Sequence, residues 1–167
     1  MQEENLLPTT YLKTSIGNLK ISGTESGICS VDFTDEWDDV STNEQIVLDC
    51  AQQLEEYFQG KRKEFSVKLD LHGTNFQKKI WNELLKIPYG KTISYIDLAA
   101  QHGDVKAIRA VAMANGKNPV AIIVPCHRVI GANGDLVGYA GGLQRKKWLL
   151  ELEGSLQPDL FSATKAL

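Results

Sequence analysis

The sequence predicts an α+β protein with a small sheet-containing domain over about residues 1–71 and a mainly helical domain over about residues 72–154. Two observations on patterning support this: apolar and polar residues alternate between residues 18 and 33, and apolar residues recur with helical spacing from residue 43 onward. The charge also changes sign along the chain. Residues 1–70 carry 6 basic against 14 acidic residues, a net charge of −8, whereas residues 71–167 carry 12 against 7, a net charge of +5. Residues 155–167 are expected to form a flexible tail.

Composition excludes several classes of protein. With 167 residues, 43% hydrophobic and 23% charged, the chain reads as an ordinary globular protein. Its first residues, MQEENLLP, are polar and acidic, unlike a signal peptide, and no apolar run is long enough to span a membrane. Three cysteines without paired spacing indicate a reducing compartment. We therefore expect a cytoplasmic protein with no membrane contact and no metal or other cofactor.

The first third of the chain is predicted to form an antiparallel meander. Leu19 and Ile21 alternate with polar neighbours, Val31 and Phe33 flank Asp32, and the turns fall at residues 17–18 and 24–27. Residues 43–59 then form a helix with one apolar stripe. Residues 65–71 are expected to add a short strand, and residues 72–74 to link the two domains.

The second part is predicted to be helical, with a helix-turn-helix candidate. A helix over about residues 76–84 ends before Pro88. Ser94, with Asp97 three residues later, caps a helix that runs to about Gln101. Asp104 caps a second helix that ends at Gly116. A further apolar run (120–124), a glycine-rich loop (131–142) and a last helix from residue 143 follow.

Of the three cysteines, Cys126 is the candidate nucleophile. Cys29 is in phase with the buried face of its strand, and Cys50 lies on the apolar stripe of the 43–59 helix, so both are interpreted as core residues. Cys126 instead lies beside His127 and Arg128, and positive charge lowers a thiol pKa. Adjacent side chains point apart, so His127 would need a turn or a bridging water to reach the sulfur, and a third group to orient its ring.

These residues belong to a longer pattern. The segment Pro125-Cys126-His127-Arg128-Val129, with Asn118-Pro119 before it and Gly138-Tyr139-Ala140-Gly141-Gly142 after it, resembles the signature of the O6-alkylguanine-DNA alkyltransferase family. The likeness continues through Ser94-Tyr95, Arg109-Ala110-Val111, Lys147-Trp148-Leu149-Leu150 and Glu153-Gly154. It covers residues 74–154 densely and the N-terminal third more weakly. The resemblance implies a ribonuclease-H-like N-terminal domain and repair of alkylated guanine in DNA.

The resemblance also implies roles for individual residues. Cys126 would accept the alkyl group irreversibly, once per molecule, while His127 draws off its proton through a water and Glu153 orients His127. Asn118 would brace the turn that carries the cysteine, and Tyr95 would donate to guanine N3. The remaining pocket residues it implies are Val129, Tyr139, Ala140 and Gly141.

Double-stranded DNA is the implied partner, bound in the minor groove by the second helix of the helix-turn-helix. On a helical wheel, Ala107, Ala110 and Ala114 form a smooth face with Lys106 at its edge, and Arg109 would fill the place of a flipped guanine. Tyr95 and Arg128 complete the expected DNA-contacting set. The protein is expected to act as a monomer at the nucleoid, or in the nucleus of a eukaryote.

Three features depart from the pattern of the family. No four-ligand zinc set is present, Ala140 stands where many relatives have Ser, and Ala121 where some have Pro, which leaves the tolerance for bulky alkyl groups open. Two alternative functions are also open. A cysteine hydrolase would share Cys and His but would turn over many times. A sequence-reading regulator would need base-reading side chains on its recognition helix, and alanines do not supply them.

Overall fold

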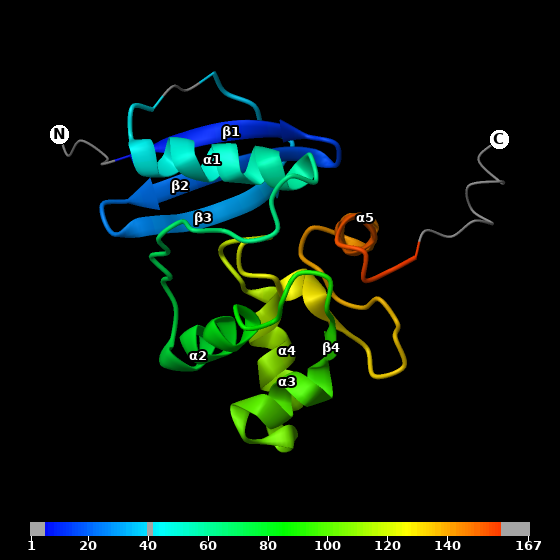
Figure 1. Cartoon of the computed structure of the whole chain (residues 1–167). Coiled ribbons are helices and arrows are strands. Elements are labelled where there is room, and N and C mark those ends of the chain that lie inside the picture. The colour runs from blue at the N-terminus through cyan, green and yellow to red at the C-terminus, as the bar shows by residue number, and fades with distance from the viewer. Residues whose placement is uncertain (1–5, 40–41, 158–167) are drawn as a thin grey trace.

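The computed structural model describes residues 6–39 and 42–157, which form a sheet-bearing part and a helical part (Figure 1). The strands β1 (Thr9–Thr14), β2 (Gly17–Thr24) and β3 (Gly27–Thr34) form an antiparallel sheet in the order β1-β2-β3. Helix α1 (Gln45–Phe58) packs on the sheet and buries Val47, Cys50, Leu54 and Tyr57. The predicted meander, helix and buried Cys50 are confirmed, but the first turn falls at residues 15–16, so residues 17–18, predicted to form it, begin β2 instead.

The interpretation of Cys29 was wrong. Ser22 pairs with Ser30 but Gly23 pairs with Ile28, so Cys29 is an extra residue at a bulge in β3. The bulge shifts the alternation of side chains, and Ile28 and Val31, three positions apart, are the buried residues of this strand. Cys29 is therefore only half-buried.

The free edge of β3 holds two extended segments of the later chain. Ile28 N–H donates to the Lys68 carbonyl and Val31 N–H donates to the Pro119 carbonyl, at 2.8 and 3.0 Å. The Ala121 N–H returns a bond to the Val31 carbonyl at 2.9 Å. The strand predicted over residues 65–71 is thus a single bridge at Leu69, because only residues 68–70 reach the sheet edge. The second bridge ties the sheet to the segment that leads to Cys126.

The helical part follows the predicted order. Helix α2 (Asn75–Leu84) begins with a capping box of Thr74 and Gln77, and α3 (Tyr95–His102) begins at its cap Ser94. Gly103, at φ +105°, makes the turn to the 3-10 helix η1 (Val105–Ala107) and α4 (Ile108–Gly116). Two short strands, β4 (Ile93–Ser94) and β5 (Val129–Ile130), pair in parallel. Strand β4 leads directly into α3, and β5 directly follows the 3-10 helix η2 (Cys126–Arg128). The last helix is α5 (Leu143–Leu152). The predicted pair of helices around a glycine turn is present.

Two predicted chain ends differ in detail. Gly116 is the last residue of α4 but does not adopt a positive φ, and Lys117 caps the helix at φ −94° and ψ 8°. In the predicted tail, Ser155 N–H and Oγ both donate to the Leu150 carbonyl, so the first tail residues are held against α5. Residues 158–167 lie outside the described residues.

One apolar core joins the two parts. Residues of the sheet and α1, such as Leu19, Val31 and Leu54, belong to the same buried cluster as Trp81 and Leu149. We propose that the domains nevertheless divide after residue 71, where an extended segment gives way to the cap of α2. Within the described ranges, no helix is long and apolar enough to cross a membrane.

Candidate active site

Cys126 follows a tightly turned segment. Ile123 N–H donates to the Ala121 carbonyl at 2.8 Å around Ile122, which has φ +71°, the unfavourable hand of a γ-turn for a branched residue. Cys126 N–H donates to the Val124 carbonyl at 2.8 Å around Pro125. The whole segment therefore needs external support, and the strained Ile122 side chain is itself buried.

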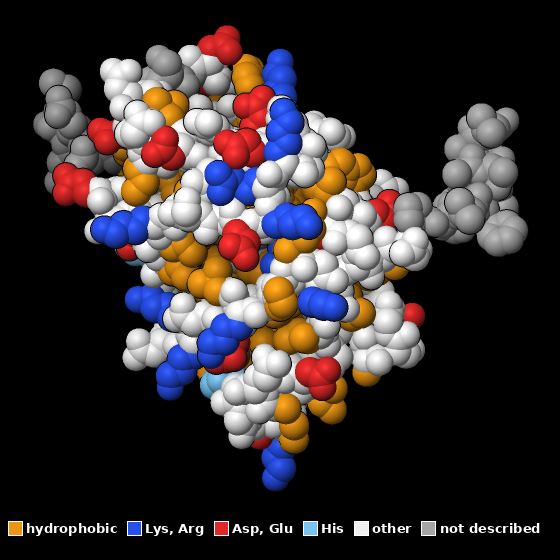
Figure 2. All heavy atoms as spheres, viewed as in Figure 1, with side chains coloured by type: hydrophobic (Ala, Val, Ile, Leu, Met, Phe, Trp, Pro, Cys, Tyr) orange, Lys and Arg blue, Asp and Glu red, His pale blue; other side chains and the backbone are white. Residues whose placement is uncertain are grey.

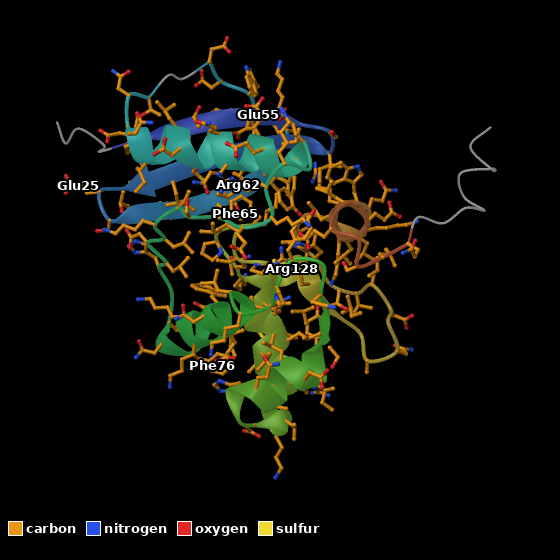
Figure 3. The ribbon with its side chains drawn as sticks, viewed as in Figure 1. Glu25, Glu55, Arg62, Phe65, Phe76 and Arg128 are labelled. Carbon is orange, nitrogen blue, oxygen red and sulfur yellow. The ribbon has the colours of Figure 1, made fainter. Side chains whose placement is uncertain are left out.

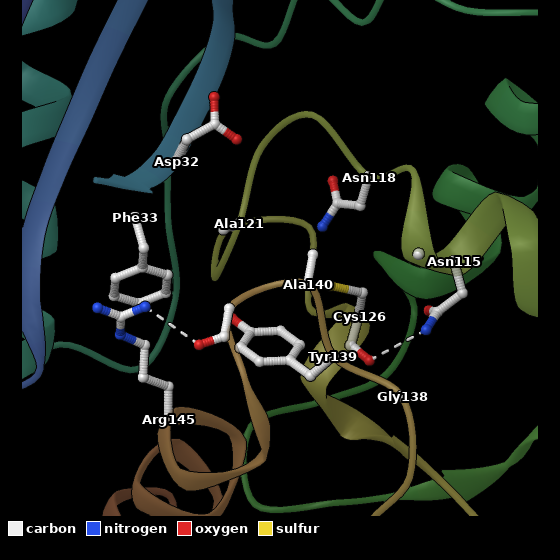
Figure 4. A pocket seen from close by; sticks show the side chains of 12 residues that line it. Asp32, Phe33, Asn115, Asn118, Ala121, Cys126, Gly138, Tyr139, Ala140 and Arg145 are labelled. Carbon is white, nitrogen blue, oxygen red and sulfur yellow. Dashed lines mark hydrogen bonds between the residues drawn. The ribbon is translucent and has the colours of Figure 1, made fainter. Parts of the chain in front are cut away.

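Asn118 supplies that support. Its Nδ2 donates to the Val124 carbonyl at 2.7 Å, and its Oδ1 accepts from Val120 N–H at 3.0 Å. One side chain thus closes both ends of the turn that precedes the cysteine. Asn115 of α4 adds a longer contact, with Nδ2 3.5 Å from the Cys126 carbonyl (Figure 4).

A fully buried cluster lies behind the cysteine, centred on Glu153. His127 Nε2 donates to Glu153 Oε2 at 2.8 Å, and Arg128 donates through Nε to Oε1 at 2.8 Å and through Nη2 to Oε2 at 3.1 Å. Tyr57 of α1 donates to Oε2 at 2.5 Å. Arg128 also donates to the Ile87 carbonyl at 2.7 Å and lies between the sheet-bearing and helical parts (Figure 3).

The ionisation of this cluster follows from its contacts. Burial alone would raise the pKa of Glu153, but the hydrogen bonds and charges of His127 and Arg128 outweigh it and lower the pKa to about 2. Burial lowers the pKa of His127 below 6.5, against the opposing effect of Glu153. The carboxylate is therefore charged and the imidazole neutral at pH 7. With Nε2–H donated to Glu153, the unprotonated nitrogen is Nδ1, which is buried and has no partner among the described residues.

The Cys126 thiol is less acidic than the sequence predicted. Burial raises its pKa above 9.0, against the smaller lowering effects of Asn118 and Lys146. Arg128 does not lower the thiol pKa as expected, because its guanidinium points away from the sulfur and binds Glu153. The resting sulfur is thus a thiol at neutral pH, and a base is needed to make the thiolate.

Lys146 of α5 and Tyr95 of α3 hold the glycine-rich loop next to the cysteine. Lys146 Nζ is buried and donates to the carbonyls of Val129 at 2.6 Å and Val137 at 2.8 Å. Burial lowers the pKa of Lys146 to about 8, and the nearby Cys126 opposes that shift. The Tyr95 hydroxyl donates to the Val137 carbonyl at 3.0 Å. Tyr95 begins α3 directly after Ser94, which pairs with Ile130 of β5.

Two cavities share this loop as a common wall. The larger, of about 600 Å³, lies between the loop and α4; its lining includes Tyr95, Arg109, Asn115, Tyr139 and Ala140. The smaller, of about 130 Å³, has Cys126 in its wall and also reaches Gly141. The predicted residues Cys126, Tyr95, Tyr139, Ala140 and Gly141 are thus brought together, whereas Val129 lies behind the cysteine, fully buried.

The predicted alanine face of α4 was partly wrong. Ala110, Lys106 and Arg109 are exposed, but Ala114 is buried and Ala107 packs against the core. Trp81 of α2 packs on this side of the helix, where its Nε1 donates to the Ala114 carbonyl at 2.8 Å. Ala114 is therefore part of the interior and not of a solvent-facing surface.

Arg128 was also misassigned. It is 6% exposed and committed to Glu153 and Ile87, so it is a structural cation and not a DNA contact. The reason is the 3-10 turn of η2, which directs both His127 and Arg128 into the interior.

Two family models match most of the chain. The ribonuclease-like domain of 6-O-methylguanine DNA methyltransferase matches residues 7–71, and the DNA-binding domain of the same family matches residues 75–155. The chain belongs to this family. The first match confirms the ribonuclease-like fold class predicted for the N-terminal part.

Curated 6-O-methylguanine DNA methyltransferases agree with this assignment. A methylated-DNA–protein-cysteine methyltransferase of Methanosarcina acetivorans is 49% identical over 152 residues, which cover 86% of this chain and 96% of the relative. One of Mycobacterium tuberculosis is 60% identical over 109 residues, covering 65% of this chain and 66% of the relative.

Solved structures of the family share the fold. The O6-methylguanine methyltransferase of Mycobacterium tuberculosis superposes with a TM-score of 0.78 at 41% identity, covering 95% of this chain and 99% of that one. A structure of the Mycobacterium tuberculosis protein in complex with DNA superposes with a TM-score of 0.79 at 46% identity, covering 87% and 91%. Members of this family are DNA-repair proteins, and DNA is the partner of this chain.

Sequence reasoning missed four residues of the site: Tyr57, Asn115, Arg145 and Lys146. Tyr57 was read only as part of an apolar stripe, and Asn115 as part of the buried side of α4. For Lys146, the only available signal was its place on the same helical face as Leu149 and Leu150, three and four residues later, where a lysine is unusual. In the part of the chain that the structure covers, no group of three or more His, Cys, Asp or Glu residues could hold a metal ion.

Proposed function

We propose that this protein repairs O6-alkylguanine in DNA by moving the alkyl group to Cys126, once per molecule. The observation that carries the proposal is the buried Glu153–His127 pair beside a cysteine that lines a cavity. Such a pair supplies a neutral imidazole whose free nitrogen is on the side away from the carboxylate. All the residues involved belong to one chain, and we propose that the monomer is the active form.

The proton of Cys126 leaves through His127. Because Nδ1 is the unprotonated nitrogen and the two side chains are sequence neighbours, we assign the transfer to a water between Sγ and Nδ1. Glu153 then stabilises the imidazolium that forms. The thiolate exists only transiently, because burial raises the pKa of the resting thiol.

The thiolate attacks the alkyl carbon in line with the carbon–O6 bond. A new sulfur–carbon bond forms as the carbon–O6 bond breaks, and the electron pair of that bond stays on O6, leaving a guanine anion. Tyr95 lies in the wall of the larger cavity, where its hydroxyl can exchange the Val137 carbonyl for ring N3 as its acceptor, and the Ala140 N–H can donate to O6. A thioether has no ready reversal, so each molecule reacts once.

DNA docks on α4 from the minor groove. The exposed side chains of Lys106 and Arg109 carry positive charge next to the exposed Ala110, and Arg109 lines the mouth of the larger cavity. On the face seen in Figure 2, most acidic side chains lie over the sheet-bearing part, away from this helix. Arg109 enters the base stack where the alkylated guanine leaves it, and the guanine enters the cavity.

Intact-mass measurement tests the proposal. After mixing with an excess of duplex that contains O6-methylguanine, the protein should gain the mass of one methyl group, mapped to Cys126. Cys126→Ser should gain none and should bind the duplex as tightly as the parent protein. Many guanines restored per protein would indicate a hydrolase instead, and a label on Cys29 or Cys50 would refute the role of Cys126.

A further inference from the structure

The cavity that holds the reactive sulfur is built partly by the N-terminal domain. It has a volume of about 130 Å³ and is lined on one side by Asp32 and Phe33 of β3 and on another by Ala121. An apolar cavity of about 150 Å³ can hold a benzene molecule, so this one has room for an alkyl group of several carbons. The larger cavity, by contrast, contains neither Phe33 nor Cys126 in its wall.

The sheet edge explains why β3 reaches the cavity. Val31 exchanges backbone bonds with Pro119 and Ala121, which precede Cys126 in the turned segment. The next residues of β3 after Val31 are therefore held beside that segment. Phe33 is half-buried there and faces the cavity together with Tyr139 (Figure 4).

Arg145 locks this wall to the glycine-rich loop. Its Nε donates to the Ile16 carbonyl in the β1–β2 turn at 2.7 Å, and its Nη1 donates to the Gly141 carbonyl at 3.1 Å. The guanidinium carbon lies 4.6 Å from the centroid of the Phe33 ring, a cation–π contact. One side chain of α5 thus joins the β1–β2 hairpin, β3 and the pocket loop.

Two glycines, one beside the Phe33 ring and one beside the Arg145 guanidinium, show how closely these side chains are packed. A Cβ at Gly141 would lie 2.8 Å from Tyr139 Cε1 and 3.0 Å from Phe33 Cδ2. A Cβ at Gly17, which has φ +120°, would lie 2.7 Å from Arg145 Nη2. The rings of Phe33 and Tyr139 therefore pack directly against the loop backbone at Gly141, which fixes the position of the Phe33 ring.

We propose that Phe33 and Arg145 form the end wall of an alkyl subsite and set the largest alkyl group that Cys126 accepts. The inference rests on the proposed function. With guanine in the larger cavity and the sulfur attacking opposite O6, substituents on the alkyl carbon project sideways, and the smaller cavity is the space beside the sulfur. Phe33 limits that space directly, whereas Arg145 is a positioning residue that holds Phe33 and Gly141 in place.

Rates of transfer from two lesions test the proposal. Single-turnover rates are measured with duplexes that contain O6-methylguanine or O6-benzylguanine, and the benzyl-to-methyl rate ratio is compared between variants. Phe33→Ala should raise the ratio about tenfold or more, since one missing or added group in an apolar pocket commonly changes selectivity by roughly 10- to 200-fold. Phe33→Trp should lower it. Leu12→Ala, a half-buried β1 residue outside the cavity, is the control for loss of sheet stability and should leave the ratio unchanged.

Arg145 variants separate positioning from general stability. Arg145→Met should raise the ratio severalfold, and Arg145→Lys should do the same, because lysine keeps the charge but not the fork that reaches Ile16 and Gly141. Rates that change equally on both lesions in the Phe33 and Arg145 variants would overturn the assignment while leaving the proposed function intact. A parent protein that transfers neither group would refute both.

Discussion

His127 Nε2 lies 2.8 Å from Glu153 Oε2, and neither side chain is exposed to solvent. The contact fixes which ring nitrogen carries the proton, because a carboxylate can only accept. It also links the middle of the helical part to its end, since His127 is in η2 and Glu153 follows α5. The chemistry proposed for Cys126 depends on this one contact more than on any other.

Glu153→Gln should therefore slow alkyl transfer strongly. The amide can donate as well as accept, so it no longer imposes the tautomer, and it cannot stabilise an imidazolium; in comparable triads such a change costs up to about 10⁴-fold. The variant should also lose about 3 kcal/mol of unfolding free energy, because Arg128 remains buried without its charged partner. Single-turnover rates and urea unfolding measure the two effects.

Glu151→Gln is the matched control for that variant. Glu151 lies in the last turn of α5, two residues before Glu153, but forms only a partly exposed pair with Lys147 at 3.8 Å, so neither rate nor stability should change appreciably. A folded Glu153→Gln protein that repairs at the parent rate would exclude the role given to Glu153.

The transfer rate should depend on pH through His127. Burial lowers the pKa of His127, so the imidazole stays neutral from about pH 8 down to 6.5. The transfer rate should therefore be constant over this range. Below that range protonation of Nδ1 removes the base and the rate falls. The free energy of unfolding also falls as the pH falls, because His127 is protonated more readily in the unfolded chain than in the folded one. Glu153, with a pKa of about 2, stays charged throughout and does not contribute to this loss.

Stopped-time transfer assays between pH 5 and 8 give the profile, with circular dichroism at each pH to show that the protein remains folded. An acid limb centred above pH 6.5 would contradict the lowered pKa of His127 and mean that the cation is favoured in the site.

Tyr57→Phe should destabilise the protein by about 1–3 kcal/mol and slow transfer less than tenfold. The hydroxyl donates to a buried carboxylate, and hydrogen bonds to charged groups contribute more than neutral ones. Arg128 and His127 still satisfy Glu153, so the tautomer persists. In Tyr89→Phe, which removes a 3.3 Å bond to the Leu152 carbonyl in a half-buried setting, the loss should be smaller. Equal losses of stability in the two variants, measured by thermal unfolding, would contradict the larger contribution assigned to the Tyr57 hydroxyl.

Arg109→Ala should slow transfer from duplex DNA at least tenfold but leave the reaction with free O6-benzylguanine base nearly unchanged. The base needs no extrusion when it is free, whereas extruding it from a duplex costs a few kcal/mol. Arg62→Ala, which removes a cation paired with Glu56 in the N-terminal part, serves as the control and should change neither rate. If both substrates slow equally in Arg109→Ala, the side chain acts in the pocket and not in the base stack.

Much of the fold follows from local pattern. The apolar stripe of α1, the Ser94 cap of α3 and the glycine turn at Gly103 were predictable, because propensity, capping and hydrophobic period act within a few residues. The candidate nucleophile was also identifiable, since the motif around Cys126 is specific. The bulge at Cys29 was not, because it is visible only when two strands are paired.

The sequence alone thus indicated most of the elements, the family and the candidate nucleophile, and the tertiary structure decided what surrounds them. Tyr57 meets Glu153 across 96 residues of chain, and Arg128 turns inward although its neighbours in sequence suggested a DNA contact. Ala114 is buried, with its carbonyl bonded to Trp81 Nε1, and does not face solvent for the same reason. Periodicity tells which residues share a face of their own helix, but which neighbour covers that face, and so which charges are buried and paired, depends on packing between distant segments.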